Sequence, residues 1–193
     1  MTPSTADHPQ MSVEDFEQLA RHAPEGVKLE FIKGKLKVKP MPEQLHRAIV
    51  MWLLRQCMQQ RPELDLYPEM DLRVETYRQG RAYADGVLAP VEHFVGHDGM
   101  WANPEGVLMA VEVTSYDSDT HARDRVEKRA AYAEASIPVY LLIDRDDNTL
   151  TVFSEPENGT YRQHPTYKYG DTVALPTPVD ITLATEKLKD YAH

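Results

Sequence analysis

The chain has 193 residues and a formal net charge of −10, with 41% apolar and 27% charged residues. The length suits one domain with a substantial core, and the acidic balance argues against a protein that coats nucleic acid by bulk electrostatics. The single cysteine, Cys57, excludes an internal disulfide and a cysteine-based zinc site.

The first residues are expected to form a flexible polar tail, residues 1–11, ahead of a single domain over residues 12–193. Met1 to Gln10 has neither the basic region nor the apolar region of a signal peptide. No apolar run in the sequence approaches the roughly 20 residues needed to cross a bilayer. We therefore expect a cytoplasmic protein without a membrane partner.

Two helices flank a hairpin in the first third of the chain. Ser12, followed by Asp15, can cap the first helix. The hairpin turns around Lys33-Gly34, and apolar residues recur at helical spacing along the second helix. The predicted elements here are a helix over Val13–Arg21, a hairpin of Val27–Ile32 and Lys35–Val38, and a helix over Glu43–Gln60.

This region also carries a local basic patch. Between Lys28 and Arg61 there are eight basic residues against two acids. Lys35, Lys37 and Lys39 alternate, so they share one face of a strand. The patch, which also includes Arg47, fits either a surface that contacts DNA phosphates or a solvated edge strand that uses lysine to resist aggregation.

A β-rich part follows. Val107–Thr114 and Val139–Ile143 are almost wholly apolar, which indicates central strands, and a predicted helix over His121–Glu134 joins them. Such a strand–helix–strand unit implies parallel neighbours, so the pattern predicts an α/β fold with a mixed β-sheet core flanked by helices. The remaining predicted elements are strands over Leu64–Tyr67, Asp71–Glu75, Ala82–Leu88, Leu150–Phe153 and Tyr161–Tyr169, a loop over Pro90–Pro104, a last short strand after Gly170-Asp171, and a closing helix over Ala184–Tyr191.

Two acidic residues interrupt apolar, β-prone segments. Asp85 and Glu112 each cost stability if the carboxylate is buried without a partner, and Lys128 lies on the helix that follows Glu112. A hydrolytic Mg²⁺ or Mn²⁺ site needs hard oxygen ligands, and two carboxylates plus a backbone carbonyl suffice. The ion would polarise a phosphate and activate a water molecule, and a nearby lysine can orient that water or stabilise the pentavalent state.

Each of these residues also has a purely structural interpretation. Asp85 precedes Gly86, and an Asp-Gly pair often marks a turn. Glu112 could face solvent on an edge strand, although its apolar neighbours favour a functional role. Asp124 and Lys128 are four residues apart on one predicted helix, which fits a surface ion pair worth roughly a few tenths of a kcal/mol.

Taken together and in this order, these segments resemble the PD-(D/E)xK nuclease superfamily and, more closely, the bacterial family of Uma-type restriction endonucleases. The similarity covers about Ser12 to Thr182. The matching motifs are Glu30 with Gly34, His46, Asp85, the strand end Glu112-Val113-Thr114-Ser115, Asp124 with Lys128 and Tyr132, and Val139 to Asp144.

The resemblance implies a restriction-endonuclease-like core with additional N-terminal and C-terminal β-hairpins. It also implies a bound Mg²⁺ (or Mn²⁺) ion. The implied site residues are Asp85, Glu112 and the backbone of Val113 as metal ligands, Lys128 as the assisting lysine, Glu30 as an auxiliary acid, and His46 facing the same cleft. The structural alternatives are a surface glutamate for Glu30 and a helix cap for His46.

Two positions depart from the superfamily pattern. The usual lysine lies two residues after the glutamate, where this chain has Thr114, so Lys128 on the following helix would take its place. Ala84 stands where a proline usually precedes the metal-binding aspartate. A proline there shapes the backbone rather than binding metal, so this departure leaves the implied site intact.

The expected function is a Mg²⁺-dependent endodeoxyribonuclease, and the resemblance suggests a homodimer that cuts two strands. One alternative is a non-catalytic nuclease-fold relic or regulatory binding module, which the acidic charge favours. Retention of Asp85, Glu112 and Lys128 together argues against that alternative. Another is a metal-dependent phosphodiesterase that acts on RNA or on a nucleotide.

Overall fold

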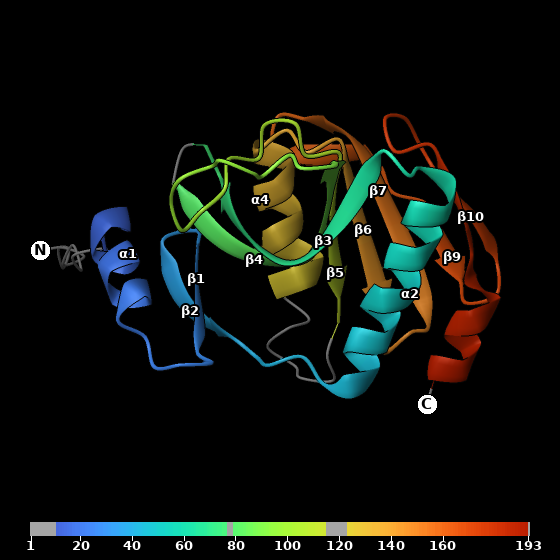
Figure 1. Cartoon of the computed structure of the whole chain (residues 1–193), viewed down its shortest axis with the longest axis horizontal. Coiled ribbons are helices and arrows are strands. Elements are labelled where there is room, and N and C mark those ends of the chain that lie inside the picture. Colours follow the sequence, from blue (N-terminus) through green and yellow to red (C-terminus); the bar gives the residue numbers. More distant parts are fainter. Residues whose placement is uncertain (1–10, 77–78, 115–122, 193) are drawn as a thin grey trace, which may run out of the picture.

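The computed structural model describes residues 11–76, 79–114 and 123–192 (Figure 1). The expectations for residues 1–10, for Ser115 and for the helix start at His121 fall outside these residues. The helical elements are α1 (Val13–Arg21), α2 (Gln44–Gln60), a π-helical segment η1 (Arg123–Lys128) that continues into α4 (Arg129–Glu134), and a 3₁₀-helical segment η2 (Thr185–Tyr191). The strands are β1 (Lys28–Ile32), β2 (Lys35–Lys39), β3 (Leu64–Val74), β4 (Gly80–Pro90), β5 (Met109–Val113), β6 (Val139–Asp144), β7 (Thr149–Glu157), β8 (Thr160–Gln163), β9 (Thr166–Lys168), β10 (Thr172–Leu175) and β11 (Ile181–Ala184).

Nine strands of the described part form one mixed sheet, in the order β2-β1-β4-β5-β6-β7-β8, with β3 paired to β4 and β9 paired to β7. Strands β5 and β6 are parallel, and η1 and α4 lie between them in the chain. This confirms the predicted strand–helix–strand unit and the mixed α/β fold. Strands β10 and β11 form a separate antiparallel pair.

Within the described residues, no helix combines the length and the apolar character needed to span a membrane.

Strand β4 changes partners along one of its edges. Strand β3 pairs with β4 from Gly80 to Pro90 along one edge. Along the other edge, β1 meets β4 at Arg81, and β5 meets it from Gly86 to Leu88. The segment Tyr83 to Asp85 therefore lies between two partner strands, and we call this gap the fork. In Figure 1 the β1–β2 hairpin lies to one side of the fork and β5 to β7 lie to the other.

Helices α2 and α4 cover opposite faces of the sheet. Alternate residues of β5 follow this division, because successive side chains of a strand point to opposite faces. Val111 packs in the core cluster that contains α2 residues, whereas Ala110 packs in the cluster that contains Ala131 and Tyr132 of α4. Glu112 has the same parity as Ala110, so its carboxylate points toward α4.

Some element boundaries differ from the predictions. The two strands expected before and after Pro68 are one continuous strand, β3, because β4 pairs with it on both sides of Pro68, at every position but Glu69. The single strand expected over residues 161–169 is divided into β8 and β9 on either side of Pro165, which has no N–H to donate to a neighbouring strand. The closing helix is present as the 3₁₀-helical segment η2.

Candidate active site

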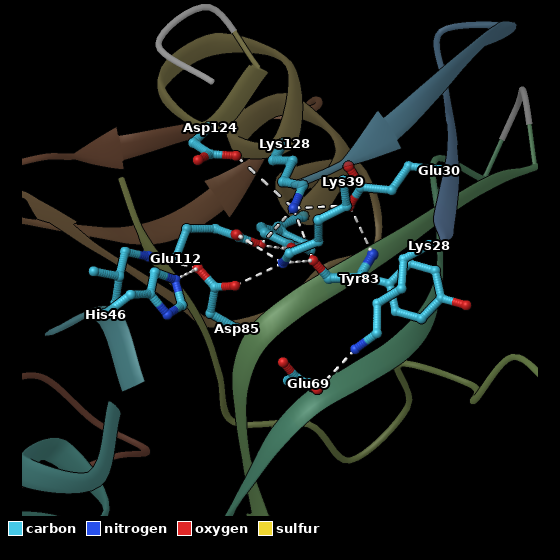
Figure 2. A network of polar contacts seen from close by, with 12 residues as sticks. Lys28, Glu30, Lys39, His46, Glu69, Tyr83, Asp85, Glu112, Asp124 and Lys128 are labelled. Atoms are coloured by element: carbon cyan, nitrogen blue, oxygen red, sulfur yellow. Dashed lines mark hydrogen bonds and ion pairs between the residues drawn. The ribbon is translucent and has the colours of Figure 1, made fainter. Parts of the chain in front are cut away.

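Buried charged side chains fill the fork (Figure 2). Each is at most 9% exposed, and together they come from the hairpin, from β4 and β5, and from η1. We call this group the acid–lysine cluster, and its members are Glu30, Lys39, Asp85, Glu112, Asp124 and Lys128. Residues that are far apart in sequence meet here because β4 leaves one edge unpaired at this point.

Asp85 is held by three groups. Its Oδ1 atom lies 2.6 Å from Nζ of Lys39. Its Oδ2 atom lies 3.0 Å from Nε2 of His46 and accepts a 2.8 Å hydrogen bond from the backbone N–H of Val113. Burial favours the neutral acid, but Lys39, His46 and Lys128 outweigh burial and lower the pKa of Asp85 well below its ordinary value. Asp85 is therefore an ionised carboxylate.

Glu112 extends from β5 toward η1 and α4. Its Oε1 atom accepts a 2.5 Å hydrogen bond from the hydroxyl of Tyr132 and lies 3.0 Å from Nζ of Lys128. Its Oε2 atom lies 3.7 Å from Nζ of Lys39. Burial, together with the charges of Asp85 and Asp124, raises the pKa of Glu112 to about 8, against the lowering effect of the two lysines. Glu112 therefore takes up a proton more readily than an exposed glutamate does.

Lys128 and Glu30 replace the hydrogen bonds that β4 lacks at the fork. Lys128 is fully buried, and its Nζ lies 2.9 Å from Oε1 of Glu30. The same Nζ donates a 2.7 Å hydrogen bond to the carbonyl of Tyr83, whose N–H donates a 2.8 Å hydrogen bond to Oε1 of Glu30. Both backbone groups of Tyr83 are thereby satisfied by side chains rather than by a neighbouring strand.

Lys39 is the second ammonium of the cluster. Besides its contacts with Asp85 and Glu112, Nζ of Lys39 donates a 2.7 Å hydrogen bond to the carbonyl of Tyr83. Burial alone would lower the pKa of Lys39, but Asp85, Glu112 and Glu30 together raise it above its ordinary value. Lys39 is therefore a permanent cation. The sequence placed Lys39 in an exposed basic patch, and that prediction is wrong because the shared face of β2 turns toward η1 and the fork.

The rest of the predicted patch is more accessible. Lys35 and Arg47 are exposed, whereas Lys37 forms an ion pair with Glu127 of η1. Lys37 and Lys39 thus lie on the same face, as their alternation predicts, but each has an acidic partner within the protein.

The structural alternatives for the site residues are not borne out. Asp85 lies within β4 rather than in a turn, and Glu112 lies on β5, an interior strand between β4 and β6. Glu30 is buried rather than at the surface, and His46 contacts Asp85. Nζ of Lys128 lies 3.8 Å from Oδ1 of Asp124, but both residues are buried in the cluster and do not form a surface ion pair.

The chemistry of the cluster fits a divalent cation. Asp85 and Glu112 bring two buried carboxylates to the same ammonium group, Nζ of Lys39. Carboxylates and carbonyls are the hard oxygen ligands that Mg²⁺ prefers, usually with several waters. The described residues contain no group of three or more His, Cys, Asp or Glu side chains arranged to hold a metal ion. A site here would therefore combine two carboxylates with backbone oxygens and water.

Two contributions to the cluster, the carbonyl of Tyr83 and the position of Lys39, could not be predicted from the sequence. The carbonyl of Tyr83 lies against both ammonium groups, but any residue carries such a carbonyl. The role of Lys39 depends on how the hairpin packs against η1, which alternation alone does not determine. The amide of Val113 contacts Asp85, whereas the implied role of its carbonyl stays a prediction.

Comparisons with known proteins identify what the chain is similar to. The model of the Uma2 family, described as "Putative restriction endonuclease", matches residues 13–186. A crystal structure from Anabaena variabilis ATCC 29413, described as "a putative nuclease belonging to DUF820", has the same fold: the TM-score is 0.70 at 18% sequence identity, over 94% of this chain and 98% of that chain. No curated protein matches the chain. The family match and the shared fold confirm the resemblance inferred from the motifs.

Proposed function

Because the chain belongs to the Uma2 family, we propose that it is a metal-dependent endonuclease that hydrolyses phosphodiester bonds of DNA. The observation that carries the proposal is the acid–lysine cluster in the fork. Asp85 and Glu112 direct two buried carboxylates at one position, and buried carboxylates need a compensating positive charge. A divalent cation would supply that charge.

Asp85, Glu112 and the backbone carbonyl of Val113 would hold Mg²⁺ or Mn²⁺. When bound, such an ion polarises the scissile phosphate and lowers the pKa of a water molecule, which becomes the nucleophile. The hydrogen bonds from His46 and from the amide of Val113 fix the orientation of the Asp85 carboxylate. This arrangement would keep the ligand oxygens in place before metal and substrate arrive.

The groups around Glu112 would play a similar positioning role. Tyr132 and Lys128 hold one oxygen of Glu112 from the side of α4 and η1. Glu30 in turn holds Lys128. We propose that Lys128 assists the reaction by stabilising negative charge that develops on the phosphate, and that Glu30 is an auxiliary acid that keeps Lys128 oriented.

DNA would approach the exposed basic residues near the fork. Lys35 on β2 and Arg47 on α2 are exposed, and Arg47 lines a surface pocket together with His46 and Asp85. A local patch of this kind can contact phosphates although the whole chain is acidic. Cleavage of both strands would require two sites, which favours a homodimer.

Cleavage of supercoiled plasmid with Mg²⁺ or Mn²⁺ tests the proposal. Wild type should nick or linearise the plasmid, Asp85→Ala should not, and the control Asp98→Ala, at an exposed position, should behave as wild type. An RNA of matched sequence distinguishes the substrate classes, since preferential cleavage of RNA would assign the site to a ribonuclease. If wild type cleaves neither nucleic acid with either metal, the proposal is wrong, and a phosphodiesterase acting on a nucleotide and a non-catalytic role are the alternatives.

A further inference from the structure

The two lysines of the cluster contact different oxygen atoms of Asp85 and Glu112, the proposed metal ligands. Lys128 contacts Oε1 of Glu112, the oxygen that also accepts the hydroxyl of Tyr132. Lys39 contacts the other oxygen, Oε2, and also Oδ1 of Asp85. Oδ2 of Asp85 already binds His46 and the amide of Val113. The carboxylate oxygens left for a shared cation are thus the two that face Lys39.

We propose that the Lys39 ammonium holds the cation position between Asp85 and Glu112, and that a divalent metal ion displaces it on binding. The inference rests on the proposed function and adds a competition between a side chain of the protein and its metal. Nζ of Lys39 also donates a hydrogen bond to the carbonyl of Tyr83, so the three groups around it present oxygen atoms of the kind that coordinate Mg²⁺. Two cations so close together would repel each other strongly.

The position of Lys39 allows it to leave, whereas that of Lys128 does not. Lys39 is the last residue of β2 and keeps 8% of its side chain accessible. Lys128 is fully enclosed and is tied to Glu30 and to Tyr83. A lysine has a flexible stem of four carbons, so the ammonium of Lys39 can move while β2 stays paired with β1. A displaced ammonium would remain near any phosphate bound to the metal.

Occupation of the cation position by Lys39 lowers the apparent affinity of the site for a metal ion. A metal ion binds only when the ammonium has moved away, so the apparent affinity falls by the fraction of molecules in that open state. Replacement of Lys39 by methionine removes the competing charge and keeps a stem of similar length. Lys37→Met is the matched control, because Lys37 lies on the same face of β2 but pairs with Glu127, outside the cluster.

Calorimetric titration with Mn²⁺ compares wild type, Lys39→Met and Lys37→Met. Lys39→Met should bind Mn²⁺ at least about tenfold more tightly than wild type, as expected for a site that is open about a tenth of the time, and Lys37→Met should stay within about twofold. Equal affinity in wild type and Lys39→Met would overturn the competition and leave the proposed function intact. Absence of binding in all three proteins would overturn both.

A second measurement uses the unaltered chain and does not depend on the folding of a variant. Lysines are acetylated with an amine-reactive reagent, with and without saturating Mg²⁺, and each site is quantified by mass spectrometry. Acetylation of Lys39 should increase several-fold with Mg²⁺, whereas Lys128 should stay protected in both conditions. Unchanged or reduced acetylation of Lys39 at saturating Mg²⁺ would contradict displacement.

Discussion

Glu112 and Lys128 belong to the proposed site and are also buried ion-pair partners within the fold. Lys128 is completely buried and makes close contacts with Glu112, with Glu30 and with the carbonyl of Tyr83. Removal of one partner of a buried ion pair leaves an uncompensated charge, which costs far more than the net stabilisation that the pair provides. The site residues are therefore also structural residues.

Lys128→Met should lower the free energy of unfolding by about 3–5 kcal/mol, because Glu30 and Glu112 would lose their shared cation. Urea denaturation followed by circular dichroism measures the change. Lys35→Met is the control, and this exposed substitution should stay within about 0.5 kcal/mol of wild type. A loss below about 1 kcal/mol for Lys128→Met would show that the fork relaxes without the lysine.

Asp71 provides a test of pH dependence away from the cluster. Burial, together with the charge of Glu69, raises the pKa of Asp71 from 3.8 to about 6. The charges of Lys28 and Lys39 oppose this shift. Between these values the folded state binds more protons than the unfolded state, so the free energy of unfolding falls as the pH rises from about 4 to 6. Above pH 6 the carboxylate of Asp71 is ionised, and its burial lowers the free energy of unfolding by a constant amount.

Asp71→Asn should therefore raise the free energy of unfolding at pH 7.5 by about 1 kcal/mol, a value reduced from the full pKa shift because the side chain is partly exposed. At pH 4 the substitution should have little effect. Urea denaturation at both pH values measures the difference, with Asp98→Asn as an exposed control. An equal effect at pH 4 and pH 7.5 would rule out the raised pKa.

The chemistry of the site residues was largely predictable from the sequence, but their contacts were not. Asp85 and Glu112 stand out because each interrupts an apolar strand, and both are buried as that pattern indicates. Glu30 and His46 were indicated by the family resemblance rather than by local pattern. Lys39 was assigned to the wrong surface, because alternation determines which residues share a face and not what that face contacts.

At the level of elements, the fork is the feature that organises the molecule. Strand β4 pairs with β3 from Gly80 to Pro90 except at Asp85, opposite Glu69, and it shares its other edge between β1 and β5. The strand–helix–strand unit was predictable because long apolar segments mark buried parallel strands. The division of the β4 edge was not, since it arises from the tertiary pairing of a distant hairpin.

Helix α2 also organises the C-terminal hairpin through its last turn. The side-chain amide of Gln60 donates a 2.8 Å hydrogen bond to the carbonyl of Thr182 and accepts a 2.9 Å bond from the N–H of Thr182. Gln60 thereby acts as a partner for the edge of β11. Gln60 and Thr182 are both exposed to solvent. Each hydrogen bond therefore stabilises the fold by an amount near the low end of about 0.5–1.5 kcal/mol.

Gln60→Ala should lower the free energy of unfolding by about 1 kcal/mol and should speed hydrogen exchange of the Thr182 amide. Denaturation and native-state hydrogen exchange measure these two effects. Gln59→Ala, one residue earlier and also exposed, serves as the control. Unchanged protection of the Thr182 amide in Gln60→Ala would mean that the paired geometry does not persist in solution.

For the whole molecule, the net charge of −10 would confine the proposed DNA binding to local surfaces. Lys35 and Arg47 are the exposed members of the predicted patch, whereas Lys37 and Lys39 pair with acids of the protein. A phosphate contact releases bound counterions, so each lost contact reduces the salt dependence of binding by about one unit of slope.

Lys35→Ala combined with Arg47→Ala should weaken duplex DNA binding and reduce the slope of log K against log salt by about two. Fluorescence anisotropy at several salt concentrations measures the slope, in an Asp85→Ala background that prevents cleavage. Lys168→Ala on β9 is the control, because it carries the same charge change at an exposed position of another strand. An unchanged slope in the double variant would assign the DNA surface to other residues.

The proposed activity depends on a divalent cation bound in the fork between Asp85 and Glu112. Anomalous diffraction from crystals grown with Mn²⁺ tests this binding most directly, because the manganese signal locates the ion independently of the surrounding protein density. One anomalous peak is expected within coordination distance of a carboxylate oxygen of each acid, with the Lys39 ammonium moved out of that position. A fork that still holds Lys39 and shows no peak at saturating Mn²⁺ would contradict it.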